Sequence, residues 1–81
     1  MIVPDRVIDA RWLDPPEPFE RIVAALEDLP ADARLRVLIH REPMPLYRLL
    51  DSSGYTHHTR FDEEHGFFEI VIGRAPSVLS H

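Results

Sequence analysis

The chain has 81 residues, of which 44% are hydrophobic and 28% charged, a composition typical of one small globular domain. Its net charge is −5, with 14 acidic and 9 basic side chains, so a nucleic acid is a poor candidate for its partner. It has no cysteine, which excludes disulfide bonds, thiol nucleophiles and thiolate metal sites. Met1 is not followed by a basic segment and an apolar run, and no stretch approaches the roughly 20 apolar residues of a membrane span. We therefore expect a cytoplasmic protein with no membrane partner.

The first third of the chain predicts a strand followed by a helix. Residues 6–10 form a short strand centred on Val7 and Ile8, and residues 16–29 form the helix. The helix has one apolar stripe, made by Phe19, Ile22, Val23, Leu26 and Leu29. Asp14 is placed to cap its N-terminus, and proline is tolerated in a first helical turn, where N–H groups have no intrahelical partner.

A second strand and a second helix follow. Residues 34–40 are nearly continuously apolar, as in a central strand, and both faces of this strand are apolar, so the sequence leaves open which one points to the core. Residues 43–53 predict a helix with Leu46, Leu49 and Leu50 on its apolar stripe. Gly54 follows it, at the place where a left-handed residue often ends a helix.

The last part of the chain predicts two strands and a tail. Residues 55–61 form a polar strand suited to a sheet edge, and residues 67–72 form an apolar one suited to the centre. The tail, 75–81, has few anchoring side chains, and we expect it to be mobile. The order β-α-β-α-β-β makes the first two strands parallel and places both helices on one face. We therefore predict one α+β two-layer sandwich over residues 1–81, with a core at about 6–74.

Several short runs of this sequence resemble a known family. They are Asp9-Ala10-Arg11, Pro15-Pro16-Glu17-Pro18, residues 41–47, Gly54-Tyr55 and residues 68–72. Over about 7–74 the chain resembles the TusA-like (SirA-like) superfamily, and within it the uncharacterised bacterial branch called domain of unknown function 2249. The resemblance implies a mixed four-stranded sheet in the order 1-2-4-3, which agrees with a central last strand.

The resemblance also limits the expected chemistry. Sulfur-carrying relatives have a Cys-Pro-x-Pro motif at the start of the first helix, where the helix N-terminus favours a reactive thiolate. Pro15 stands here in place of that cysteine, and Trp12 in place of a glycine that usually precedes the motif. We therefore expect no persulfide transfer, and the branch itself implies no activity.

Three basic side chains follow the carboxyl ends of the two parallel strands. Arg11, His40 and Arg41 are expected beside both helix N-termini, where open α/β sheets bind ligands and helices attract anions. Five prolines around these helix starts remove backbone donors, and nearby acidic residues oppose an anion. Arg11 also has a simpler interpretation, as the partner of Asp9 in a structural ion pair.

The histidines of the polar strand are weak candidates for metal ligands. His57 and His58 are adjacent on a strand, so their side chains point to opposite faces. His65 lies in the predicted turn, and no metal motif has this spacing. We expect no metal site, no cofactor and no catalytic residue.

The sheet face without helices is a candidate interface. If Ile8, Val37 and Ile70 face the helices, apolar side chains remain on the other side. These are Val7, Leu38, Phe67 and Val71. Such a patch is typical of an interface, and scattered surface apolar residues are the alternative.

The sequence therefore predicts a non-catalytic binding or adaptor module that acts on a protein partner or forms a weak homodimer. The alternative is a sensor of a small ligand or anion at the carboxyl ends of the first two strands. A broad exposed sheet face favours the first hypothesis, and a concave pocket at the strand ends favours the second.

Overall fold

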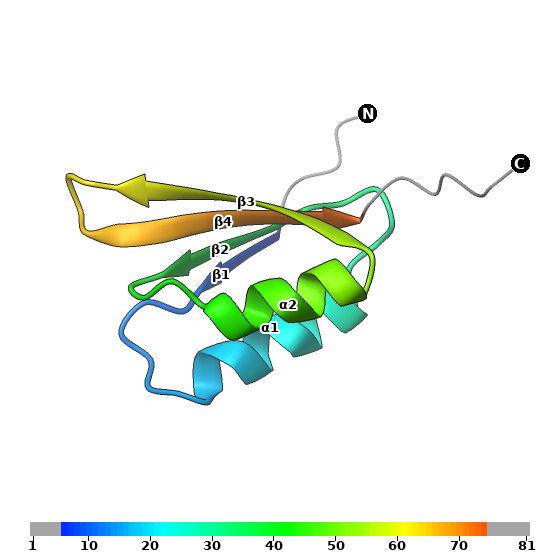
Figure 1. Ribbon diagram of the computed structural model, residues 1–81, viewed down its shortest axis with the longest axis horizontal. Helices are drawn as coiled ribbons and strands as arrows, with labels where there is room; N and C mark the ends of the chain where they lie inside the picture. The colour runs from blue at the N-terminus through cyan, green and yellow to red at the C-terminus, as the bar shows by residue number, and fades with distance from the viewer. Residues whose placement is uncertain (1–5, 75–81) are drawn as a thin grey trace, which may run out of the picture.

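A computed structural model describes residues 6–74 as a four-stranded sheet with two helices (Figure 1). The elements, in chain order, are β1 (Arg6–Asp9), α1 (Glu17–Glu27), β2 (Leu35–Ile39), α2 (Met44–Ser52), β3 (Tyr55–Asp62) and β4 (Phe67–Arg74). Both helices lie on the same side of the sheet, which makes a two-layer α+β sandwich.

The strands are arranged in the order β1-β2-β4-β3, as predicted. β1 and β2 are parallel, with Ile8 opposite Val37, and β4 is antiparallel to both β2 and β3. The two most apolar strands, β2 and β4, lie at the centre of the sheet. A central strand has a neighbour on each edge and is therefore more buried than an edge strand.

The register settles which side of β2 faces the helices. Leu35, Val37 and Ile39 are buried, as are Ile70 and Ile72 opposite them on β4. They meet the apolar stripes of the helices, where Ile22 and Leu26 of α1 and Leu46 and Leu50 of α2 are buried. Sequence reasoning left this parity open, and the antiparallel register with β4 resolves it because alternate residues share a face.

The other side of the sheet, called the open face below, carries paired charges between apolar side chains. Glu69 on β4 lies between Arg36 Nε at 3.5 Å and Arg60 Nη2 at 3.0 Å. Of the four candidate interface residues, Val7 is 59% exposed, and Leu38, Phe67 and Val71 are only partly exposed. The apolar part of this face is therefore smaller than the sequence pattern suggests.

The ends of α1 and α2 differ in part from the predictions. The Asp14 side chain does not cap α1, because the helix begins after Pro16 and the Asp14 carbonyl accepts a hydrogen bond from the N–H group of Glu17. The helix ends at Glu27, two residues before the predicted end. Gly54 has a φ of +80°, as expected for the residue that reverses the chain after α2. The predicted mobile tail, 75–81, lies outside the described residues.

Candidate functional site

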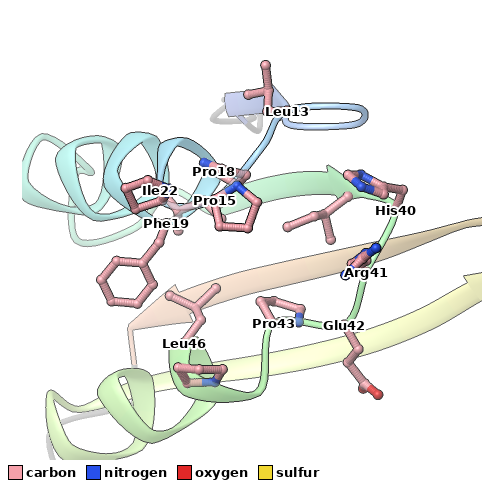
Figure 2. A pocket seen from close by; sticks show the side chains of 13 residues that line it. Leu13, Pro15, Pro18, Phe19, Ile22, His40, Arg41, Glu42, Pro43 and Leu46 are labelled. Atoms are coloured by element: carbon pink, nitrogen blue, oxygen red, sulfur yellow. The ribbon is translucent and has the colours of Figure 1, made fainter.

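A cavity of about 250 Å³ lies between the starts of the two helices (Figure 2). Its wall contains five prolines, so we call it the proline cavity. The lining residues are Leu13, Pro15, Pro16, Pro18, Phe19, Ile22, Ile39, His40, Arg41, Glu42, Pro43, Pro45 and Leu46. Its floor is made by Ile22, Ile39 and Leu46, which belong to the buried core. The cavity is therefore an opening into the apolar layer between sheet and helices.

The Pro-x-Pro segments make the wall of this cavity apolar. The segment at Pro16-Glu17-Pro18 opens α1, and the segment at Pro43-Met44-Pro45 opens α2. Proline has no N–H group, and other donors of these turns are used within the chain. The N–H group of Glu17 bonds to the carbonyl of Asp14 at 3.0 Å, and the N–H group of Leu46 bonds to that of Pro43 at 2.9 Å. An anion held by helix N–H groups has little support in this arrangement.

Phe19 is the clearest residue that sequence reasoning misplaced. It belongs to the predicted core stripe of α1, yet it is 39% exposed, and Pro18 is buried beside it. Figure 2 shows the Phe19 ring extending from α1 toward Leu46 on α2. A signal was available in the spacing of Pro18, Phe19 and Ile22, which lie on one face of the helix that follows Pro15 and Pro16.

His40 forms the end of the cavity where β2 stops. The backbone N–H group of Trp12 donates a hydrogen bond to Nδ1 of His40 at 2.9 Å. The two rings stack with their centroids 5.2 Å apart. Trp12 has a φ of +69°, a left-handed conformation that a bulky residue adopts only when its surroundings support it. His40 thus attaches the loop after β1, which carries Leu13 and Pro15 to the cavity, to the end of β2.

Arg41 and Glu42 line the mouth of the cavity, and both are exposed. The Glu42 carboxylate accepts a hydrogen bond from the Tyr47 hydroxyl at 3.0 Å, and Figure 2 shows it turned away from His40. Burial raises the pKa of Tyr47 above its usual value, so the hydroxyl remains a donor to Glu42 at neutral pH. Within the described chain Arg41 has no ion pair, which leaves its positive charge available at the mouth.

Arg11 does not line the proline cavity. Its guanidinium makes a two-pronged ion pair with Asp9, with an Nη2–Oδ2 distance of 2.7 Å and an Nε–Oδ1 distance of 2.8 Å. The same guanidinium lies 4.8 Å from the centroid of the Phe67 ring, on the open face. The hydrogen bonds from Arg11 lower the pKa of Asp9 to about 2. Of the three predicted ligand residues, the fold therefore brings together His40 and Arg41 and places Arg11 elsewhere.

The three histidines of the second half of the chain lie apart from this cavity. His57 is stacked on Tyr47 on the helix side of the sheet, with Nε2 3.1 Å from Asp51 Oδ1. His58 lies opposite Val71 on the other side, and His65 pairs with Asp62 in the turn. Within residues 6–74, no three side chains of His, Asp or Glu come together as a metal site requires.

The fold and the cavity define a small two-layer α+β domain with an apolar pocket at its helix starts. The sequence matches the family of uncharacterised conserved proteins called DUF2249 over residues 7–77, and the chain belongs to that family. No curated protein and no solved structure matches the chain. No helix in the described part of the chain is long and apolar enough to cross a membrane.

Proposed function

We propose that this domain is a non-catalytic binding module that holds a small, mainly apolar molecule in the proline cavity. The observation that carries the proposal is the opening itself: a cavity of about 250 Å³ reaches the core residues Ile22, Ile39 and Leu46. Protein interiors are close-packed, and a cavity of roughly 150 Å³ is enough to bind benzene. The cavity therefore has room for about one ring with a substituent.

The residues around the cavity favour binding over turnover. Apart from His40, Arg41 and Glu42, the lining side chains are apolar, and none is a serine, threonine or cysteine. We also propose that the domain is related to the TusA-like sulfur carriers and that it acts in the cytoplasm. Pro15 lines the cavity at the position of the carriers' cysteine, so this domain would keep the carriers' site without their thiol.

Toluene is a suitable first probe because it is a single ring without polar groups. Burying roughly 160 Å² of apolar surface at about 25 cal/mol per Å² contributes a gross transfer free energy of about 4 kcal/mol before the cost of association is subtracted, so we expect toluene to bind with a Kd on the order of 1 mM or weaker. Titration of the ¹⁵N-labelled full chain should shift the amide signals of Ile22, Ile39 and Leu46 with one common binding curve. The absence of shifts, or shifts that do not saturate, would contradict the proposal.

A matched pair of variants tests whether the cavity wall makes the contact. Phe19→Ala removes a ring at the cavity, and Phe61→Ala removes one on β3, where Phe61 is 47% exposed and packs on Phe68. Loss of roughly 40 Å² of contact predicts about fivefold weaker toluene binding for Phe19→Ala. Phe61→Ala should bind toluene as the wild type does.

Protein contact through the open face is a second candidate function. It is favoured by Val7, a large apolar side chain that is 59% exposed beside the paired charges of this face. A weak homodimer is the simplest assembly of this kind, because a two-fold axis uses the same patch twice.

A further inference from the structure

This inference rests on the proposed function and names the ligand class. We infer that the proline cavity selects a small monocarboxylate, whose apolar body fills the cavity and whose carboxylate accepts a hydrogen bond from Nε2 of His40 beside Arg41.

The first step concerns the proton on the His40 ring. The N–H group of Trp12 donates to Nδ1 at 2.9 Å, so Nδ1 is an acceptor and carries no proton. The neutral ring then has its proton on Nε2. The backbone of the loop after β1 therefore sets the tautomer of His40, which makes His40 a hydrogen-bond donor at the cavity.

The second step concerns the surroundings of the Nε2 donor of His40. Within residues 6–74 the ring of His40 is hydrogen-bonded through Nδ1 and not through Nε2. The ring is only partly buried at the edge of the cavity. Figure 2 shows His40 and Arg41 on the same side of the cavity, at the end of β2. We therefore place the acceptor group of a ligand at this end of the cavity, which His40 and Arg41 both line.

The third step concerns charge. Arg41 is a second donor at the mouth, and its charge favours an anionic acceptor over a neutral one. Glu17 is paired with Arg21 at 2.8 Å, and Glu42, which accepts a hydrogen bond from the Tyr47 hydroxyl, keeps its negative charge at the mouth but points away from His40 (Figure 2). Apart from Glu42, the other lining side chains are apolar, so a second carboxylate would find no donor side chain in the cavity, and a monocarboxylate fits better than a dicarboxylate.

Benzoate and toluene form a matched pair of probes, because both have one ring and only benzoate has a carboxylate. The full-length ¹⁵N-labelled protein is titrated with each probe at the same pH and ionic strength. We expect benzoate to bind about tenfold more tightly than toluene, the value of one charge-assisted hydrogen bond.

The variant His40→Asn separates the two roles of the ring. The amide oxygen of asparagine replaces Nδ1 as the acceptor for Trp12, but nothing replaces Nε2. The fold should persist, and the ratio of the toluene Kd to the benzoate Kd should fall about tenfold, whatever the change in toluene affinity caused by loss of the ring. Arg41→Ala should also reduce the preference, and Arg48→Ala, which removes the same charge from an exposed position on α2, should not.

The outcomes separate the inference from the proposed function. If neither probe binds, the proposed function fails and the inference fails with it. If toluene binds as tightly as benzoate, or if His40→Asn keeps the full preference, the cavity binds ligands but the carboxylate inference is wrong. A long-range ¹H–¹⁵N spectrum that shows the His40 proton on Nδ1 would contradict its first step directly.

Discussion

Arg11 and Arg41 look alike in the sequence, since each follows a parallel strand by one or two residues, but they have different neighbours in the fold. Arg11 is held by both carboxylate oxygens of Asp9 and lies over Phe67. Arg41 lies at the proline cavity without an ion pair in the described chain. The difference arises because Asp9, two residues before Arg11, points to the open face, away from the helices.

The Asp9–Arg11 pair predicts a specific pH dependence. Asp9 has a pKa of about 2, lowered from 3.8 mainly by the side-chain hydrogen bonds of Arg11. Its stabilising effect is therefore fully present above about pH 4 and is lost as the pH falls through about 2. A carboxyl ¹³C titration should place the midpoint near pH 2, and Arg11→Ala should return it toward the ordinary value. An ordinary midpoint in the wild type would show that the ion pair does not persist in solution.

At the scale of elements, the family resemblance and the apolar last strand predicted the order of the strands, and helical spacing predicted the buried faces of the helices apart from Phe19. Leu46 and Leu50 of α2, and Ile22 and Leu26 of α1, are buried as the helical spacing predicts. The parity of β2 could not be predicted because both of its faces are apolar, and only the register with β4 determines it.

The candidate site was predictable only in part. The prolines mark both helix starts, and topology brings those starts together at the ends of β1 and β2. The cavity between them is lined by side chains of both helices, among them Phe19 and Leu46, and no local pattern shows how these lie relative to one another. The residues of the hydrogen bond between Trp12 and His40 are 28 positions apart in the sequence, so the periodicity of the sequence could not predict this bond or its contribution to the site.

The reversal after α2 predicts a local cost for one substitution. Gly54 has a φ of +80° and open space where a Cβ atom would lie, so Gly54→Ala meets strain and no clash. Thermal unfolding should show a loss of about 1 kcal/mol, or roughly 4–8 °C. Gly73→Ala is the matched control, because Gly73 has no left-handed φ and its added Cβ would be in ordinary contact with Arg34 at 3.5 Å. Equal losses at both positions would contradict this explanation.

At the scale of the whole molecule, one side of the sheet is covered by helices and the other is not (Figure 1). Self-association through the open face predicts that the mean mass in sedimentation rises with concentration. Val7→Arg should abolish the rise without unfolding the protein, because Val7 is 59% exposed and contributes little to the core. If the wild type remains monomeric at high concentration, the homodimer hypothesis fails.

The central claim is that a small ligand occupies the proline cavity and not the open face. Nuclear Overhauser effects between toluene protons and the protein's methyl groups test it most directly, because they require a separation of a few ångströms. We predict contacts to the methyl groups of Ile22, Ile39 and Leu46, and none to those of Val7 and Val71. Contacts to Val7 and Val71, without any to Ile22 or Leu46, would contradict the claim.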